Sequence, residues 1–69
     1  MVYFFERGGS FIRCEVHHAR DHYELVIVCS DGTESVERYA DADSVHSRQV
    51  AVQARLIKGG WSGPHGRSI

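Results

Sequence analysis

Residues 22–39, HYELVIVCSDGTESVERY, decide the fold. The continuous apolar run at 25–29 is typical of a strand that is buried on both faces. The dipeptide Asp31-Gly32 that follows favours a hairpin, because glycine tolerates the positive φ of a tight turn. The polar segment after this turn carries charged side chains, which suit the edge of a sheet because they discourage pairing with other chains. This stretch therefore predicts two antiparallel strands, over residues 22–30 and 33–39.

Two further strands are predicted on the N-terminal side of this hairpin. Residues 10–18 alternate between apolar and polar side chains, and such alternation indicates a half-buried strand. The pair Gly8-Gly9 separates this segment from the apolar residues 2–7, which predicts a second hairpin. The short polar segment 19–21 joins the two hairpins as a turn.

The hydrophobic period changes to that of a helix after residue 40. Asp41 is a favourable N-cap, and an apolar stripe with helical spacing follows it, formed by Val45, Val52 and Leu56. Gly59-Gly60 predicts the end of the helix. With Gly60 in a left-handed conformation, Trp61 packs back on the last turn.

These elements predict an α+β fold, an antiparallel meander of three to four strands with one C-terminal helix packed on one face. We expect residues 1–61 to form a single small domain. We expect residues 62–69, which are rich in glycine and serine, to form a flexible tail with few contacts. The predicted core consists of Ile12, Cys14, Val16, Leu25, Ile27, Cys29, Val36, Val45, Val52 and Leu56.

Length and composition limit the functional classes. The chain has 69 residues, a formal net charge of −1 and 42% hydrophobic residues, which is ordinary for a globular domain. A domain this small buries only roughly 60% of its unfolded surface. No segment approaches a membrane span, and the first residues lack the pattern of a secretion signal. We therefore expect a cytoplasmic protein with reduced cysteines.

Five histidines are the most unusual feature of the composition, and His17, His18 and His22 surround one predicted turn. Together with Cys14, His18 and His22 would supply three ligands of a tetrahedral zinc site. No Cys-x-x-Cys pair supports such a site, however, and His17 and His18 point to opposite faces of a regular strand. We therefore predict no metal. A pH-sensing role for these histidines stays open, because the imidazole pKa lies near about 6.5.

A cysteine–histidine nucleophile would make the chain an enzyme, but it needs a partly exposed thiolate beside a base. Cys14 lies on the apolar face of its segment, and Cys29 ends the apolar run of the next strand. Both thiols are therefore expected in the core. Because no glycine-rich phosphate motif is present either, we predict neither catalysis nor a cofactor.

The sheet face away from the helix is predicted to be an interaction surface. When Leu25 and Ile27 face the helix, Val26 and Val28 face the other way. One helix covers only one side of a sheet, and soluble monomers rarely expose a large apolar patch. We therefore predict a non-catalytic interaction module that homodimerises through its sheet. The predicted interface consists of Phe5, Phe11, Val26, Val28 and Tyr39. Alternatively, the N-terminal strand folds over this face and the chain stays monomeric.

The order of elements over residues 10–58 resembles the DNA-binding domains of plant ethylene-response factors and the arm-binding domains of integrases. Those domains insert the free face of a sheet into the major groove, which implies a nucleic-acid-binding module as the alternative function. Arg13, Arg20 and Arg38 would then contact phosphates. Residues 1–40 carry four arginines against seven acidic residues, so the charge favours a protein partner over a nucleic acid.

Three stretches also resemble small single-domain bacterial proteins that combine a hairpin sheet with a C-terminal helix. They are YELVI at 23–27, SDGTE at 30–34 and LIKGGW at 56–61. The resemblance implies a bacterial source and the same order of elements, and it implies no activity.

Overall fold

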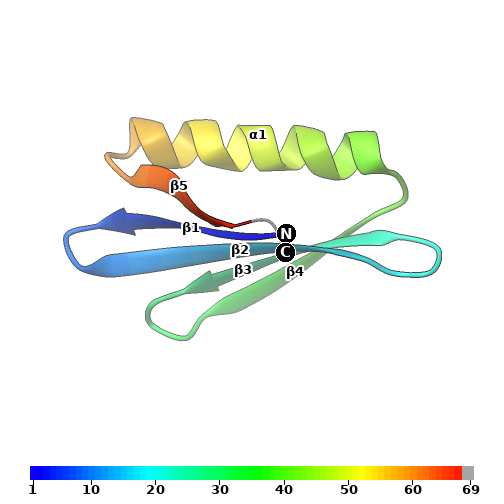
Figure 1. Cartoon of the computed structure of the whole chain (residues 1–69), viewed down its shortest axis with the longest axis horizontal. Coiled ribbons are helices and arrows are strands. Elements are labelled where there is room, and N and C mark those ends of the chain that lie inside the picture. Colours follow the sequence, from blue (N-terminus) through cyan, green and yellow to red (C-terminus); the bar gives the residue numbers. More distant parts are fainter. Residues whose placement is uncertain (68–69) are drawn as a thin grey trace.

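The computed structural model describes residues 1–67, which form one sheet and one helix. The elements are β1 (Val2–Arg7), β2 (Ser10–His18), β3 (Tyr23–Cys29), β4 (Glu34–Tyr39), α1 (Ala42–Lys58) and β5 (Ser62–Arg67). The sheet is antiparallel with the strand order β4-β3-β2-β1-β5, and α1 packs against one of its faces (Figure 1). The predicted α+β class and the antiparallel meander with one helix on one face are confirmed, but the sheet has five strands instead of three to four, and β5 follows the helix.

The two ends of α1 have the capping interactions that the sequence predicts. The Asp41 side chain accepts a hydrogen bond from the Ser44 N–H at 2.7 Å. At the other end Gly60 has a φ of 90°, and the Trp61 N–H donates to the Leu56 carbonyl at 3.0 Å, which is a Schellman motif. These interactions satisfy backbone groups that a helix end leaves without partners.

Arg7 attaches this C-terminal end of α1 to the first hairpin. Its guanidinium donates to the Gly59 carbonyl at 2.8 Å and lies 4.7 Å from the centre of the Trp61 ring. The Trp61 side chain is partly buried, and its contact with Arg7 is a cation–π interaction.

The turn between β3 and β4 contains one residue more than a two-residue Asp31-Gly32 turn. The Cys29 N–H donates to the Thr33 carbonyl at 2.8 Å, so three residues lie between the paired ends of the strands. The Asp31 side chain accepts from the Thr33 N–H at 2.8 Å, and Gly32 has a φ of 91°. The Asp31 carboxylate and the left-handed Gly32 together stabilise this longer turn.

The extra turn residue shifts the register of β4 by one and reverses its two faces. Val36 pairs with Val26 and lies on the face away from α1, where it is 52% exposed. Tyr39 lies on the helix side, where its hydroxyl donates to Glu37 at 2.6 Å. The predictions of Val36 as a core residue and of Tyr39 as an interface residue are therefore both wrong, and for the same reason.

Residues 62–67 form the strand β5 along β1, which corrects the prediction of a flexible tail with few contacts. The glycines that suggested flexibility are the residues that permit this pairing. A Cβ atom at Gly63 would lie 2.8 Å from the Phe5 ring, and one at Gly66 would lie 3.0 Å from Tyr3 Cα. Residues 68–69 of the predicted tail lie outside the described residues.

The core is thin. Phe5, Cys14 and Leu25 are fully buried, and Val45 of α1 is 3% exposed. The other predicted core residues except Val36 are partly buried, namely Ile12, Val16, Ile27, Cys29, Val52 and Leu56. Phe5 pairs with Ile12 under the helix, so its prediction as an interface residue is wrong. The chain exposes 4782 Å², compared with about 4,400 Å² for a typical monomer of this mass.

Candidate interaction face

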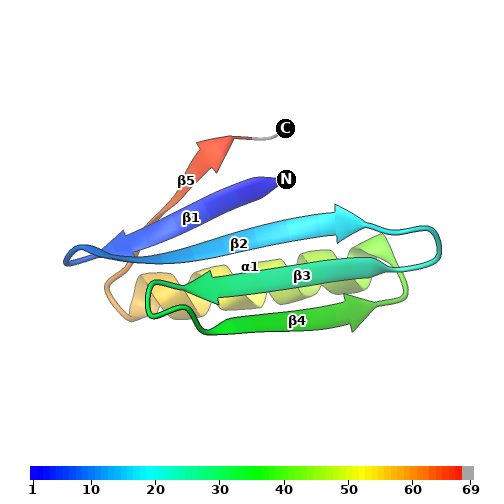
Figure 2. The ribbon, with the colours of Figure 1, turned by 90° about the horizontal axis from the view of Figure 1, so that it is seen from below.

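The free face, defined here as the sheet face away from α1, is turned toward the viewer in Figure 2. Four strands contribute its apolar side chains, which are Val2, Phe4, Phe11, Val26, Val28 and Val36. The rings of Phe4 and Phe11 lie 5.7 Å apart, and Phe11 is 45% exposed. Three predicted interface residues, Phe11, Val26 and Val28, therefore lie on this face, whereas Phe5 and Tyr39 lie on the other.

Three apolar residues of the free face, Val2, Phe4 and Val36, are absent from the predicted interface, although the sequence contains a signal for Phe4. A two-residue Gly8-Gly9 turn pairs Arg7 with Ser10, as observed. Counting back along both strands from that pair places Phe4 on the same face as Phe11. No comparable signal was available for Val36, because its face depends on the length of the later turn.

Arg13 and Glu15 occupy the centre of the free face on β2. Arg13 Nε lies 2.7 Å from Glu15 Oε2, so the two side chains form an ion pair along the strand. Each residue has an apolar cross-strand neighbour on both sides: Phe4 and Val28 for Arg13, Val2 and Val26 for Glu15. The face is therefore an apolar surface with one positive and one negative group at its centre.

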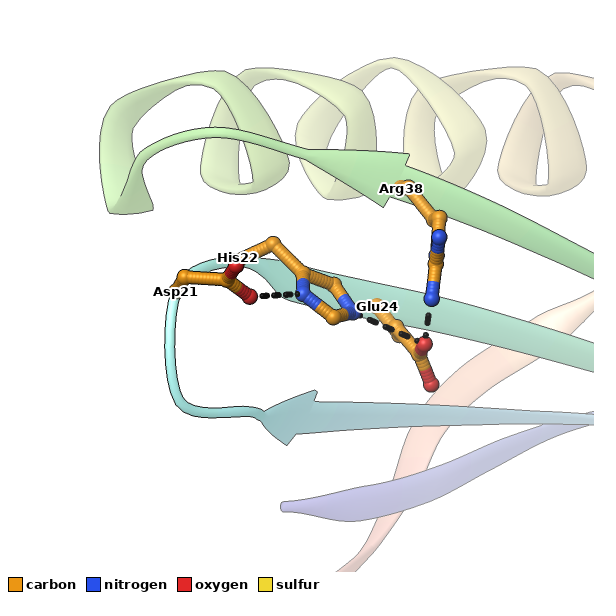
Figure 3. A network of polar contacts seen from close by, with 4 residues as sticks. All are labelled: Asp21, His22, Glu24 and Arg38. Carbon is orange, nitrogen blue, oxygen red and sulfur yellow. Dashed lines mark hydrogen bonds and ion pairs between the residues drawn. The ribbon is translucent and has the colours of Figure 1, made fainter.

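A network of four charged side chains lies at the end of this face, beside the β2–β3 turn (Figure 3). His22 Nδ1 is 2.7 Å from an Asp21 oxygen, and His22 Nε2 is 2.9 Å from a Glu24 oxygen. Arg38 Nε on β4 lies 3.5 Å from the same Glu24 oxygen. Because ionised carboxylates only accept hydrogen bonds, both ring nitrogens of His22 must carry protons to make these contacts.

The hydrogen bonds of this network shift the protonation equilibria of its members. The bond to Asp21, supported by that to Glu24, raises the pKa of His22. In return, the bonds from His22 lower the pKa of Asp21 and the pKa of Glu24. The network therefore favours a cationic imidazole between two anionic carboxylates.

The structure separates the three groups of the zinc site that the sequence analysis considered. Cys14 is fully buried, and burial raises the pKa of its thiol to about 11, so the thiolate that a metal needs is disfavoured. His18 stacks on Tyr23 at 4.2 Å between ring centres, and both nitrogens of His22 are engaged. Residues 1–67 contain no group of three or more His, Cys, Asp or Glu side chains placed to hold a metal ion.

An open groove of about 330 Å³ lies between α1 and the strands β1 and β5. Gln49 of α1 donates to the Tyr3 hydroxyl there at 3.1 Å, and His46 and His65 also line the groove. None of its described lining residues is Asp, Glu, Lys or Arg. The polar side chains that line it are those of Tyr3, His46, Gln49, Gln53 and His65.

No protein-family model matches the chain, and no curated protein or solved structure is significantly similar to it. Within residues 1–67, α1 falls short of a membrane-spanning helix. The functional interpretation therefore depends on the geometry and chemistry of the free face.

Proposed function

We propose that the protein is a small non-catalytic interaction module that forms a homodimer through its free face. The observation that carries this proposal is the apolar surface formed by Phe4, Phe11, Val26, Val28 and Val36, which retains solvent exposure in the single chain. Soluble monomers rarely keep a contiguous apolar patch of more than a few hundred Å². Because β1 extends the sheet at the side of β2, it does not fold over this surface.

The charges at the centre of the face support a second copy of the chain as the partner. Arg13 and Glu15 lie two residues apart on β2 and point to the same side. In a face-to-face dimer whose twofold axis crosses the strands between them, Arg13 of each copy lies opposite Glu15 of the other. The same axis places Val26 of each copy against Val28 of the other, so the centre of the face complements itself in shape and in charge.

The size of the face supports the same partner. The molecule measures 38 by 22 by 21 Å, and a standard interface buries about 800 Å² on each partner. Burial of this face would stabilise a chain whose core contains only a few fully buried side chains, because association favours the folded state by mass action.

A charge-exchange experiment tests the homodimer, with Arg13→Glu and Glu15→Arg as the two variants. Each variant alone places like charges at the centre of both copies, so its self-association should weaken about tenfold or more in sedimentation equilibrium. An equimolar mixture should recover dimers, because the acidic centre of one variant then meets the basic centre of the other.

Arg55→Glu is the matched control, because Arg55 lies exposed on α1, on the opposite side of the sheet, and its self-association should equal that of the wild type. Variants that stay monomeric after mixing contradict the proposed interface. Recovery in the mixture separates a contact between copies from the ion pair within one chain, because the charges within each copy remain alike.

A nucleic-acid partner has less support. Arg13 and Arg38 are both held by carboxylates on the same face, those of Glu15 at 2.7 Å and Glu24 at 3.5 Å. These acidic groups oppose the approach of phosphates. Retention on heparin that falls steeply with salt would favour this alternative over the homodimer.

A further inference from the structure

The charged network at the end of the free face adjoins the valine cluster, which consists of Val26, Val28 and Val36. Glu24 pairs with Arg38 across β3 and β4, and the next pair of that ladder on the same face is Val26 with Val36. A partner that covers these valines therefore also removes water from the neighbouring carboxylate of Glu24. The cost of that step depends on how well this carboxylate is neutralised.

We propose that the ionisation of His22 controls the strength of the homodimer, which is tighter when the ring is protonated. The proposal rests on the homodimer described above. With a protonated ring, the network of Asp21, His22, Glu24 and Arg38 contains two positive and two negative groups. Loss of the proton leaves a net charge of −1 and removes one of the two hydrogen bonds of the ring.

Glu24 is the side chain through which this change reaches the interface. Its contact with His22 at 2.9 Å is shorter than its contact with Arg38 at 3.5 Å. A neutral His22 ring offsets the negative charge of neither carboxylate. Glu24 is then desolvated in the dimer with only its longer contact to Arg38 in place. A symmetric dimer contains two such networks, and their effects on the dissociation constant multiply.

Three titratable groups near His22, namely Asp21, Glu24 and Tyr39, keep their charge state through the relevant pH range. Asp21 and Glu24 stay ionised because their pKa values are lowered by His22. Tyr39 of β4, which lines the same hollow, stays neutral because its hydrogen bond to Glu37 raises its pKa. On β2, His17 pairs in register with Glu24 and lies 2.9 Å from Glu15, which makes His17 the matched control.

The direction of the pH effect follows from Glu24, whose desolvation in the dimer costs less while His22 carries its proton. The protonated network persists above the ordinary imidazole value of 6.5, and its contribution is lost as the pH rises through the raised value of the folded chain. The homodimer should therefore be strongest below about pH 6.5 and should weaken toward about pH 9.

Sedimentation equilibrium of the full chain at about pH 6 and about pH 9, with a reducing agent present, tests the proposal. The wild-type dissociation constant should rise about tenfold between these values, since each copy loses one surface ion pair. His22→Gln should associate weakly at both pH values, and His17→Gln should keep the wild-type dependence. Imidazole NMR of the wild type at about pH 6 should show protons on both ring nitrogens of His22.

Each other outcome overturns a defined part of the account. A wild-type dimer of equal strength at both pH values refutes the role of His22 and leaves the homodimer standing. The same conclusion follows from a pH dependence that survives in His22→Gln, or from a neutral His22 ring at about pH 6. A wild-type monomer at both pH values refutes the homodimer itself and the switch with it.

Discussion

The two faces of this sheet consist of alternate residues of the same strands, yet only one of them is covered. The helix face contains Phe5, Cys14 and Leu25, which are fully buried. The free face presents Phe4 beside Phe5 and Val26 beside Leu25, and these neighbours keep part of their surface exposed. The strands β1 and β3 have apolar residues on both faces, whereas β2 alternates, and α1 covers the face that contains most of the apolar residues of β2.

The ion pairs of the two faces differ in what they connect. On the helix face, Glu37 of β4 accepts from Arg48 of α1 at 2.8 Å, so this pair joins two layers of the fold. On the free face, Arg13 and Glu15 form their pair within one strand, and no second layer takes part in it. The free face therefore presents an ion pair and apolar side chains that the proposed second copy would cover.

Neighbouring phenylalanines give the largest expected difference between the faces. Phe5→Ala should lower the free energy of unfolding by about 3–5 kcal/mol, because it empties a fully buried site. Phe4→Ala should cost clearly less, and its cost should grow with protein concentration, because Phe4 contributes through association. Thermal and urea unfolding at two concentrations measure both effects. Equal losses for the two variants would contradict the assignment of the faces.

A methyl group at Gly63 tests the close approach of β5 to the helix side of β1. Gly63→Ala should cost about 1–3 kcal/mol, since the added Cβ meets the Phe5 ring and the backbone has a positive φ. Gly9→Ala is the control, because Gly9 also has a positive φ and a Cβ there meets nothing within 4 Å. Chemical denaturation should rank Gly63→Ala as the more damaging change, and the reverse order would argue against β5 as part of the core.

Acid should weaken the helix face through Glu37. Its hydrogen bonds from Arg48 and Tyr39 lower the pKa of the Glu37 carboxyl, so its contribution is present above the ordinary value and is lost as the pH falls through the lowered one. The wild type should lose stability between about pH 6 and about pH 3, and this loss should be about 1 kcal/mol smaller in Glu37→Gln. Glu34→Gln, at an exposed position of the same strand, is the control. Its free energy of unfolding should fall between these pH values by as much as that of the wild type.

Replacing a valine by threonine adds a buried or an exposed hydroxyl group, depending on the face. The exposed case gives the smallest expected effect. At a protein concentration low enough to keep the chain monomeric, Val36→Thr should change the free energy of unfolding by less than about 0.5 kcal/mol, because Val36 is then exposed on the free face. Val45→Thr should cost about 1–3 kcal/mol, because it buries a hydroxyl under α1. A large loss of thermal stability in Val36→Thr would instead support the register of β4 in which Val36 belongs to the core.

The strands β1 to β4 and the helix α1 were predictable from local sequence, but the register of β4 was not. The period of residues 10–18 and the caps at Asp41 and Gly60 determine their elements through nearby residues. The register of β4 depends on whether Asp31-Gly32 forms a two- or a three-residue turn, and both turns suit that dipeptide. One residue of difference exchanged the environments of Val36 and Tyr39.

The strand β5 and the charged network were missed for a different reason. A segment rich in glycine is typical of a flexible tail, and only the backbone of β1 shows that Gly63 and Gly66 allow close approach. The sequence places His22 and Glu24 two residues apart, which indicates side chains on one face of a strand. Arg38 joins them through strand pairing, which no local pattern indicates.

Sedimentation equilibrium of the wild-type chain at about 100 µM, beside Val26→Glu, tests the central claim most directly. The account predicts a wild-type mass near twice 7.8 kDa, because the free faces of two copies cover each other. Val26→Glu should sediment as a folded monomer, because it places a carboxylate within the valine cluster. A wild-type chain that sediments at 7.8 kDa under these conditions would contradict the account.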